Sequence, residues 1–285
     1  MFNILYHNIS VDKNNILVYN KNEKRGEKME LTGFQVWSYG TIASLIAGAA
    51  TSLGALPIFF MKKTLTEKQL DMALGFAAGV MLAATMFSLI VPAIEFGGIT
   101  ITVIGIIIGA IILELMDTYA PHEHFLKGHE GPNLAVVKKV WLFVIAITLH
   151  NFPEGMAVGV SFGGGTTEMI KNGIVVATAI GIQNIPEGTA TAVSFIKAGY
   201  TKKQAFWYSA FSGFVEPIGG IIGATFIVLM KPALPFFLAL AAGAMLYVIS
   251  DEIIPETHAH NNERAATFSL IFGFLVMMIL DNALG

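Results

Sequence analysis

The chain has 285 residues, of which 54% are hydrophobic and only 13% are charged, and its mean hydropathy is +0.66. A soluble domain carries about twice this charged fraction, so the composition excludes an ordinary soluble protein and indicates an integral membrane protein. The net charge of −3 argues against a nucleic-acid partner, and the lack of cysteine excludes disulfides and thiolate metal sites.

Residues 1–28 are polar and rich in Asn and Lys, without an amphipathic pattern. Met29 then opens the segment "MELTGFQVWSYG", which resembles a natural start. Two interpretations stay open: residues 1–28 are an N-terminal extension that is disordered in the mature protein or absent from it, or they are a real external tail. In both cases we expect a single transmembrane domain over residues 29–285.

Eight apolar stretches follow, and each is long enough to predict a transmembrane helix. The fold class expected is therefore all-α and integral to the membrane. The eight predicted spans are residues 34–60, 72–94, 96–116, 140–163, 173–196, 204–230, 233–250 and 265–284.

The distribution of basic residues predicts the orientation, because cytoplasmic loops are enriched in Lys and Arg. The loops after the second, fourth and sixth spans contain only Lys171 and Lys231. The other set of loops is therefore expected in the cytoplasm, with both termini outside. That set carries Lys62, Lys63, Lys68, Lys127, Lys138, Lys139, Lys197, Lys202, Lys203 and Arg264.

Two pairs of motifs indicate an inverted repeat. "HNFPEGMAVGVSF" (150–162) and "QNIPEGTATAVSF" (183–195) agree at eight of thirteen positions, and "AAGVML" (77–82) resembles "AAGAML" (241–246). The members of each pair lie on spans that cross the membrane in opposite directions. Inverted repeats are typical of transporters that bind their substrate near the midplane, at the repeat interface.

Three acids, Glu154, Glu187 and Glu216, are predicted near the middles of the fourth, fifth and sixth spans, which contain no Lys or Arg to pair with them. Each charged carboxylate would cost about 2.5–3.5 kcal/mol at that depth. Either the acids form a neutral, hydrogen-bonded cluster that fixes helix packing, or they face a cavity and hold a cation. The accompanying His and amides favour the cation.

Helical spacing gathers the expected ligands on one face of each span, because residues three and four apart are neighbours on a helix. With Glu154 and Glu187 as bridges, one site would add an imidazole and an amide, and a second would add two amides and a carboxylate. Imidazole with carboxylate suits Zn²⁺, Fe²⁺, Mn²⁺ or Co²⁺, whereas the all-oxygen site is less selective. The candidate ligands are His150, Asn151, Glu154, Gln183, Asn184, Glu187 and Glu216.

Prolines accompany all three acids. Pro153 and Pro186 cannot donate to the preceding helical turn, so each is expected to kink its helix, and Pro217 predicts a third kink beside Glu216. Glycines recur every four residues, a spacing that allows close contact between membrane helices. These glycines are Gly155, Gly159, Gly163, Gly219 and Gly223.

The motifs "HNFPEG", "QNIPEG", "FVEPIGG", "MDTYAPHEH" and "DEIIPETH" together resemble the ZIP (Zrt/Irt-like protein) family of divalent metal transporters, of the bacterial GufA-like type. The resemblance implies eight helices in a 3+2+3 inverted repeat and import of Zn²⁺ and related metals. It also implies a binuclear centre on the residues grouped above and a transport bundle of helices one, four, five and six. The remaining helices would form a scaffold, often dimeric, in the cytoplasmic (inner) membrane.

This chain departs from many relatives at two ligand positions. Gln183 stands where many have His, which removes a nitrogen ligand and puts a strict preference for zinc in doubt. Asn184 stands where some have Asp, so the second site is less negative.

An access route is also expected from polar residues and one methionine, although ordinary interfacial acids would look the same. The expected route residues are Met81, Ser88, Glu95, Asp117, Asp251, Glu252 and Asp281. Two polar loops could catch emerging metal at low affinity, or could simply be solvated. Their histidines are His122, His124, His129, His258 and His260.

Two further function classes stay open. An intramembrane metallohydrolase would use the same His and Glu residues to activate water, but no H-E-x-x-H helix is present. A structural membrane scaffold is disfavoured by the buried acids. We therefore expect a metal importer that is not an enzyme and has no resident cofactor, with the metal ion as its substrate.

Overall fold

The computed structural model describes residues 9–11, 17–19, 31–119, 122–124, 128–130 and 139–284, with side chains described over 31–119 and 150–284. Two short hairpins, β1 (Ile9–Val11) with β2 (Leu17–Tyr19) and β3 (His122–His124) with β4 (Gly128–Glu130), pair antiparallel. The predicted extension at residues 1–28 otherwise lies outside the described residues and stays a prediction.

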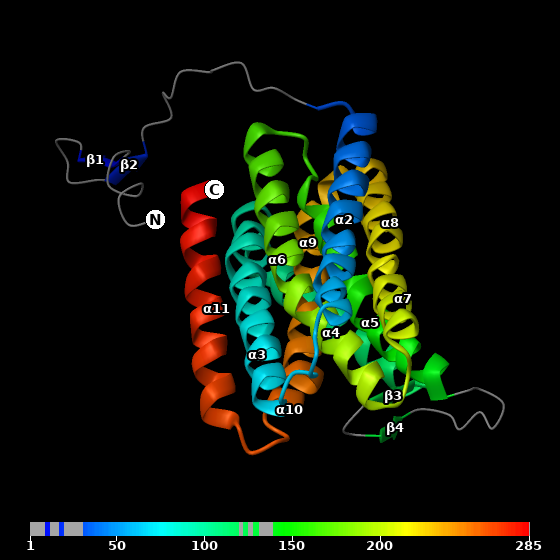
Figure 1. Cartoon of the computed structure of the whole chain (residues 1–285). Helices are drawn as coiled ribbons and strands as arrows, with labels where there is room; N and C mark the ends of the chain where they lie inside the picture. The colour runs from blue at the N-terminus through cyan, green and yellow to red at the C-terminus, as the bar shows by residue number, and fades with distance from the viewer. Residues whose placement is uncertain are drawn as a thin grey trace.

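The rest of the described chain is a bundle of long helices (Figure 1). The first three segments are α2 (Gly33–Ala55) with the 3₁₀ turn η1 (Leu56–Phe59), α3 (Glu67–Ala84) with the π-helical turn η2 (Thr85–Ile90), and α4 (Val91–Tyr119). The next are α5 (Lys139–Ser161), α6 (Thr167–Lys197), α7 (Lys202–Gly213) and α8 (Val215–Leu229). The last are η3 (Lys231–Ala233), α9 (Leu234–Val248), η4 (Ile249–Ile253, π-helical), α10 (Ile254–Thr257) and α11 (Glu263–Leu284).

Capping residues set several of these helix starts. Thr32, Thr66 and Thr201 each begin a T-x-x-Q capping box, in which the threonine accepts from a backbone N–H and the glutamine side chain accepts from the threonine N–H. This reciprocal arrangement satisfies two donors that a helix start leaves free. Gly98, with φ +75° and ψ 168°, breaks the long helical stretch just inside the third predicted span, which was expected to begin at residue 96.

Five helical stretches of the described chain are long and apolar enough to cross a membrane: 33–59, 67–119, 202–229, 231–257 and 263–284. The stretch 67–119 contains the second and third predicted spans, and its break is at Gly98 rather than at residue 95, where the two predicted spans meet. Although α6 has 31 residues, it is not one of the five. Its interior holds Gln183, Asn184 and Glu187, polar residues that lower its hydropathy.

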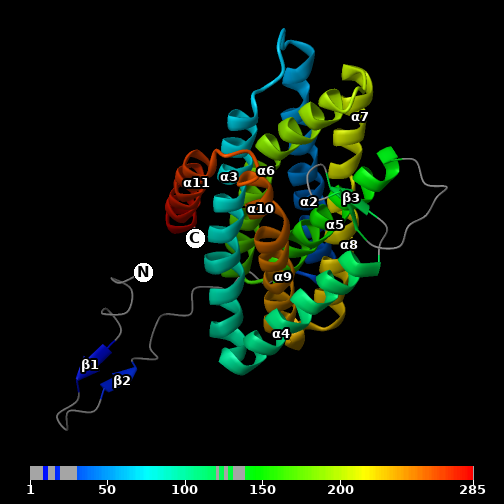
Figure 2. The same cartoon turned by 90° about the horizontal axis from the view of Figure 1, so that it is seen from below.

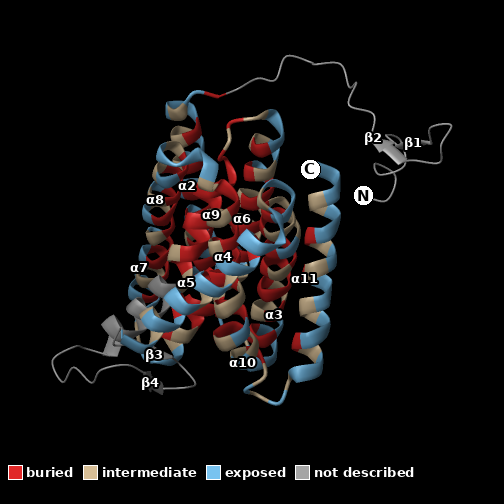
Figure 3. Ribbon diagram, turned by 180° about the vertical axis from the view of Figure 1, so that it is seen from behind, coloured by how far each residue is buried: buried red, intermediate tan, exposed pale blue. Residues whose placement is uncertain are grey.

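Packing divides the helices into two groups. In one, α5 packs on α8, and α2 packs on both α6 and α8; in the other, α3 packs on α11 and α4 on α9. Contacts of α6 with α3, and of α5 with α9, join the groups. In both views α11 lies at the edge beside α3, and buried residues concentrate in the middle of the bundle (Figures 2 and 3).

The prolines act differently from one helix to the next. Both α5 and α6 continue as helices through Pro153 and Pro186. In the sixth predicted span, α7 ends at Gly213 and α8 begins at Val215, so Glu216 and Pro217 lie in a first turn, where proline disturbs no helical hydrogen bond.

Candidate metal centre

Helices α5, α6 and α8 bring the seven predicted ligands to the middle of the bundle. Five of them are buried, with 0–1% of the surface exposed, and His150 and Glu187 are half-buried. The buried five are Asn151, Glu154, Gln183, Asn184 and Glu216.

A chain of hydrogen bonds runs across this centre from α5 to α8. The Gln183 amide donates to Glu154 Oε2 at 2.6 Å and to Asn184 Oδ1 at 2.8 Å. The Asn184 amide donates to Glu216 Oε1 at 2.7 Å and to the carbonyl oxygen of Ala47, on α2, at 2.8 Å. Both amide groups have thus used their two hydrogens, and the two acids are separated by amides.

Several polar atoms of this centre have no hydrogen-bond partner within the described residues. They are Oε1 of Glu154, Oε1 of Gln183, Oε2 of Glu216 and both side-chain polar atoms of Asn151. Buried polar atoms are rarely left unpaired, because each costs about 1–3 kcal/mol. Four of these atoms are oxygens, and amide oxygens and ionised carboxylate oxygens coordinate cations, so the centre offers what a cation requires.

The remaining two predicted ligands are Glu187 and His150. Glu187 lies close enough to His150, Glu154 and Glu216 for their charges to interact. The Nε2 atom of His150 contacts Oε2 of Glu252, which is buried in η4. Glu252 was expected on the access route, and the structure puts it at the edge of the centre.

The acids do not form a tight carboxylate cluster. In the part of the chain that the structure describes, no three His, Asp or Glu side chains lie together as a group that could hold a metal ion by themselves. The acids stay apart because the side chains of Gln183 and Asn184 lie between Glu154 and Glu216. An ion bound between Glu154 and Glu216 would therefore need amide as well as carboxylate oxygens, which are a hard and weakly selective ligand set.

The structure brings some of the expected access residues together and leaves others apart. Ser88 is buried in η2 and donates to Asp281 Oδ1, on α11, at 2.6 Å. Met81 is buried in α3, whereas Glu95 is exposed on α4. Asp117 and Asp251 are half-buried on α4 and η4. Their role as a metal route stays a prediction.

The loop histidines have two different settings. The side chains of His122, His124 and His129 lie outside the described residues. His258 Nδ1 is 2.8 Å from the carbonyl oxygen of Ile254, and His260 Nδ1 is 3.0 Å from Oδ1 of buried Asp71. These contacts fasten the turn before α11 onto neighbouring helices, so both rings have structural partners.

Two residues that sequence reasoning did not single out also contribute. The Asn172 side chain, on α6, donates to the carbonyl oxygen of Ser88 at 3.1 Å. The Ala47 carbonyl oxygen holds Asn184 from α2. Neither belongs to a motif, and a backbone acceptor has no signal in a sequence.

The chain matches a known protein family. The family described as "ZIP Zinc transporter" matches residues 120–281, more than half of the chain. The chain belongs to the ZIP family. Its members include the zinc transporter GufA of Myxococcus xanthus, which is 41% identical to this chain over 255 residues, covering 86% of this chain and 99% of GufA.

Two further ZIP relatives are also similar to this chain. Zinc transporter ZIPB of Bordetella bronchiseptica is 41% identical over 259 residues, with 87% of this chain and 82% of ZIPB covered. Human zinc transporter ZIP11 is 35% identical over 325 residues, with 82% of this chain and 94% of ZIP11 covered. The ZIP resemblance expected from the five motifs is therefore confirmed.

Proposed function

We propose that the protein imports divalent transition metals, Zn²⁺ and also Fe²⁺, Mn²⁺, Co²⁺ or Cd²⁺, through a binuclear centre near the membrane midplane. The observation that carries the proposal is the set of four buried, unpartnered oxygens on Asn151, Glu154, Gln183 and Glu216. His150 and Glu187 would complete the ligands. The names of the relatives GufA, ZIPB and ZIP11 describe zinc transporters, which supports this substrate class.

The packing supports alternating access. The group formed by α2, α5, α6, α7 and α8 corresponds to the expected four-span transport bundle, and α3, α4, α9 and α11 correspond to the scaffold. Eight spans in a 3+2+3 inverted repeat follow if the stretch 67–119 crosses twice and α5 and α6 cross as well. The repeat is supported by the π-helical turns η2 and η4, each of which follows one of the two AAG motifs and precedes a proline.

We also propose a location in the cytoplasmic membrane with both termini outside. The C-terminal end of α2 and the start of α7 lie at the end of the bundle opposite the connection from α8 to α9 (Figure 1). The first end carries Lys62, Lys63, Lys202 and Lys203 and the second carries Lys231, which agrees with cytoplasmic enrichment of basic residues. A homodimer is part of the proposal by family resemblance alone.

The competing interpretation, an intramembrane metallohydrolase, gains nothing from the relatives, whose names describe transporters. An amide-rich ligand set also suits ion exchange better than a catalytic zinc held by three strong ligands. The test is metal uptake into proteoliposomes containing only the purified protein. Entry of metal without any added substrate supports transport, and entry no faster than into empty liposomes would refute it.

Gln183→His should shift preference toward Zn²⁺ over Mn²⁺, because an imidazole adds a borderline-soft nitrogen where an amide oxygen discriminates weakly. The measurement is the ratio of the two uptake rates under competition. Gln183→Leu serves as the control: it removes the side-chain ligand without adding nitrogen, so it should slow both metals without favouring Zn²⁺. An unchanged ratio in Gln183→His would mean that residue 183 does not contact the transported ion.

A further inference from the structure

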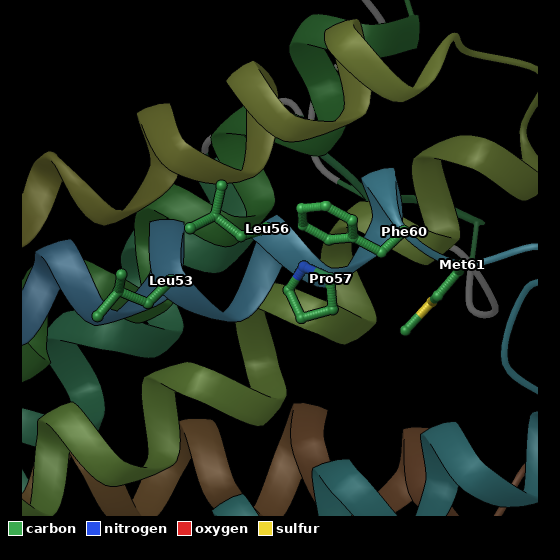
Figure 4. Close-up of a pocket in the computed structure, with 5 residues that line it drawn as sticks. All are labelled: Leu53, Leu56, Pro57, Phe60 and Met61. Atoms are coloured by element: carbon green, nitrogen blue, oxygen red, sulfur yellow. The ribbon is translucent and has the colours of Figure 1, made fainter.

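An apolar stripe ends the first membrane helix. Leu53, Leu56, Pro57, Phe60 and Met61 follow the spacing i, i+3, i+4, i+7 and i+8, which places them along one helical face. They line an open groove of about 410 Å³ (Figure 4). Phe60 is 85% exposed, whereas Ile58, on the opposite face, is fully buried. The groove therefore faces away from the protein core.

Four lysines lie at the base of this groove. Lys62 and Lys63 continue the chain directly from Met61 and are exposed. Lys202, at the start of α7, donates from Nζ to the Met61 carbonyl oxygen at 2.7 Å, and Lys203 is next to it. None of these four lysines forms an ion pair with another residue that the structure describes. Their positive charge is thus free to meet an external anion.

The depth of the groove matches the boundary between acyl chains and headgroups. Leu53, Leu56 and Pro57 lie in the last turns of the apolar stretch 33–59, Phe60 and Met61 follow this stretch directly, and the lysines begin at residue 62. Trp207, on the adjacent α7, is 57% exposed, and tryptophan is enriched at membrane interfaces. Lysine clusters directly beyond a membrane helix attract anionic lipids of the cytoplasmic leaflet.

We propose that this groove binds an anionic phospholipid of the cytoplasmic leaflet. One acyl chain would lie along the stripe from Leu53 to Met61, and the phosphate would lie among Lys62, Lys63 and Lys202. A second copy of the chain is a poorer occupant. A two-fold interface on this patch would bring two lysine clusters together at the same depth.

The test is native mass spectrometry of the full chain purified in detergent, with added phosphatidylglycerol or phosphatidylcholine of identical acyl chains. The wild type should retain phosphatidylglycerol preferentially. Lys62→Gln/Lys63→Gln should lower that retention about 30-fold, which converts roughly 1 kcal/mol for each of two lysines. The matched control, Lys171→Gln/Lys231→Gln at the opposite end of the bundle, should leave retention unchanged.

Leu56→Trp, which fills the groove, should lower retention of phosphatidylglycerol without changing the lysines. Equal retention of both lipids by the wild type, or unchanged retention in Lys62→Gln/Lys63→Gln, would overturn the proposal. A loss of dimer in Leu56→Trp with lipid retention unchanged would identify the groove as a subunit interface instead. The readout is lipid binding, so it is independent of whether the protein carries metal.

Discussion

Glu154→Ala and Glu187→Ala should each abolish metal uptake, because each removes a carboxylate that we propose to be shared by two ions. Replacing an outer-shell partner of a metal ligand already costs about 10–100-fold in affinity or activity, and a shared ligand should cost more. The measurement is the initial rate of uptake into proteoliposomes with matched amounts of protein. Glu168→Ala, an exposed acid in the first turn of α6, is the control and should transport normally.

Glu216→Ala should be milder, because Glu216 would serve only the second ion. In the structure Glu216 is separated from Glu154 by Gln183 and Asn184, which agrees with unequal roles. Near-normal uptake in Glu154→Ala or Glu187→Ala would refute the binuclear proposal. Equal loss in all three variants would indicate a single site made of three carboxylates.

Gly155→Ala should strongly destabilise the protein. A methyl group at Gly155 would overlap the main-chain oxygen of Glu216, so α5 and α8 would have to move apart at the level of the centre. Overpacking of this kind typically costs about 1–3 kcal/mol, and more where backbone must shift. We expect a lower midpoint of thermal unfolding in detergent and displacement of Glu216, with loss of uptake even in protein that folds.

Gly181→Ala is the matched control, because it makes the same substitution inside α6. A methyl group at Gly181 would meet only the Cα atom of Ala47, at 3.9 Å, which is ordinary van der Waals contact. Since alanine is favoured over glycine in a helix by about 1 kcal/mol, this variant should be as stable as the wild type or more stable. If both variants unfold at the same temperature, close contact at Gly155 does not limit the packing of α5 on α8.

Much of the fold could be predicted because membrane helices are long and leave strong local signals. The apolar stretches predicted the helices and a division between residues 94 and 96, whereas the break lies at Gly98, because glycine adopts a positive φ without steric cost. The π-helical turns η2 and η4 were not predicted, since a single extra residue in a helical turn leaves no periodic pattern. The break between α7 and α8 was expected only as a kink.

The sequence by itself determined which residues are chemically able to form the centre. His150, Glu154, Gln183 and Glu187 recur with helical spacing in two motifs, and spacing along one helix is a local property. Only the tertiary structure decided how the helices combine them. It puts Gln183 and Asn184 between the acids, brings Glu252 from η4 to His150, and supplies the Ala47 carbonyl oxygen from α2. These contacts join residues far apart in the chain, so they depend on how closely α2, α5, α6 and α8 pack, which no local pattern specifies.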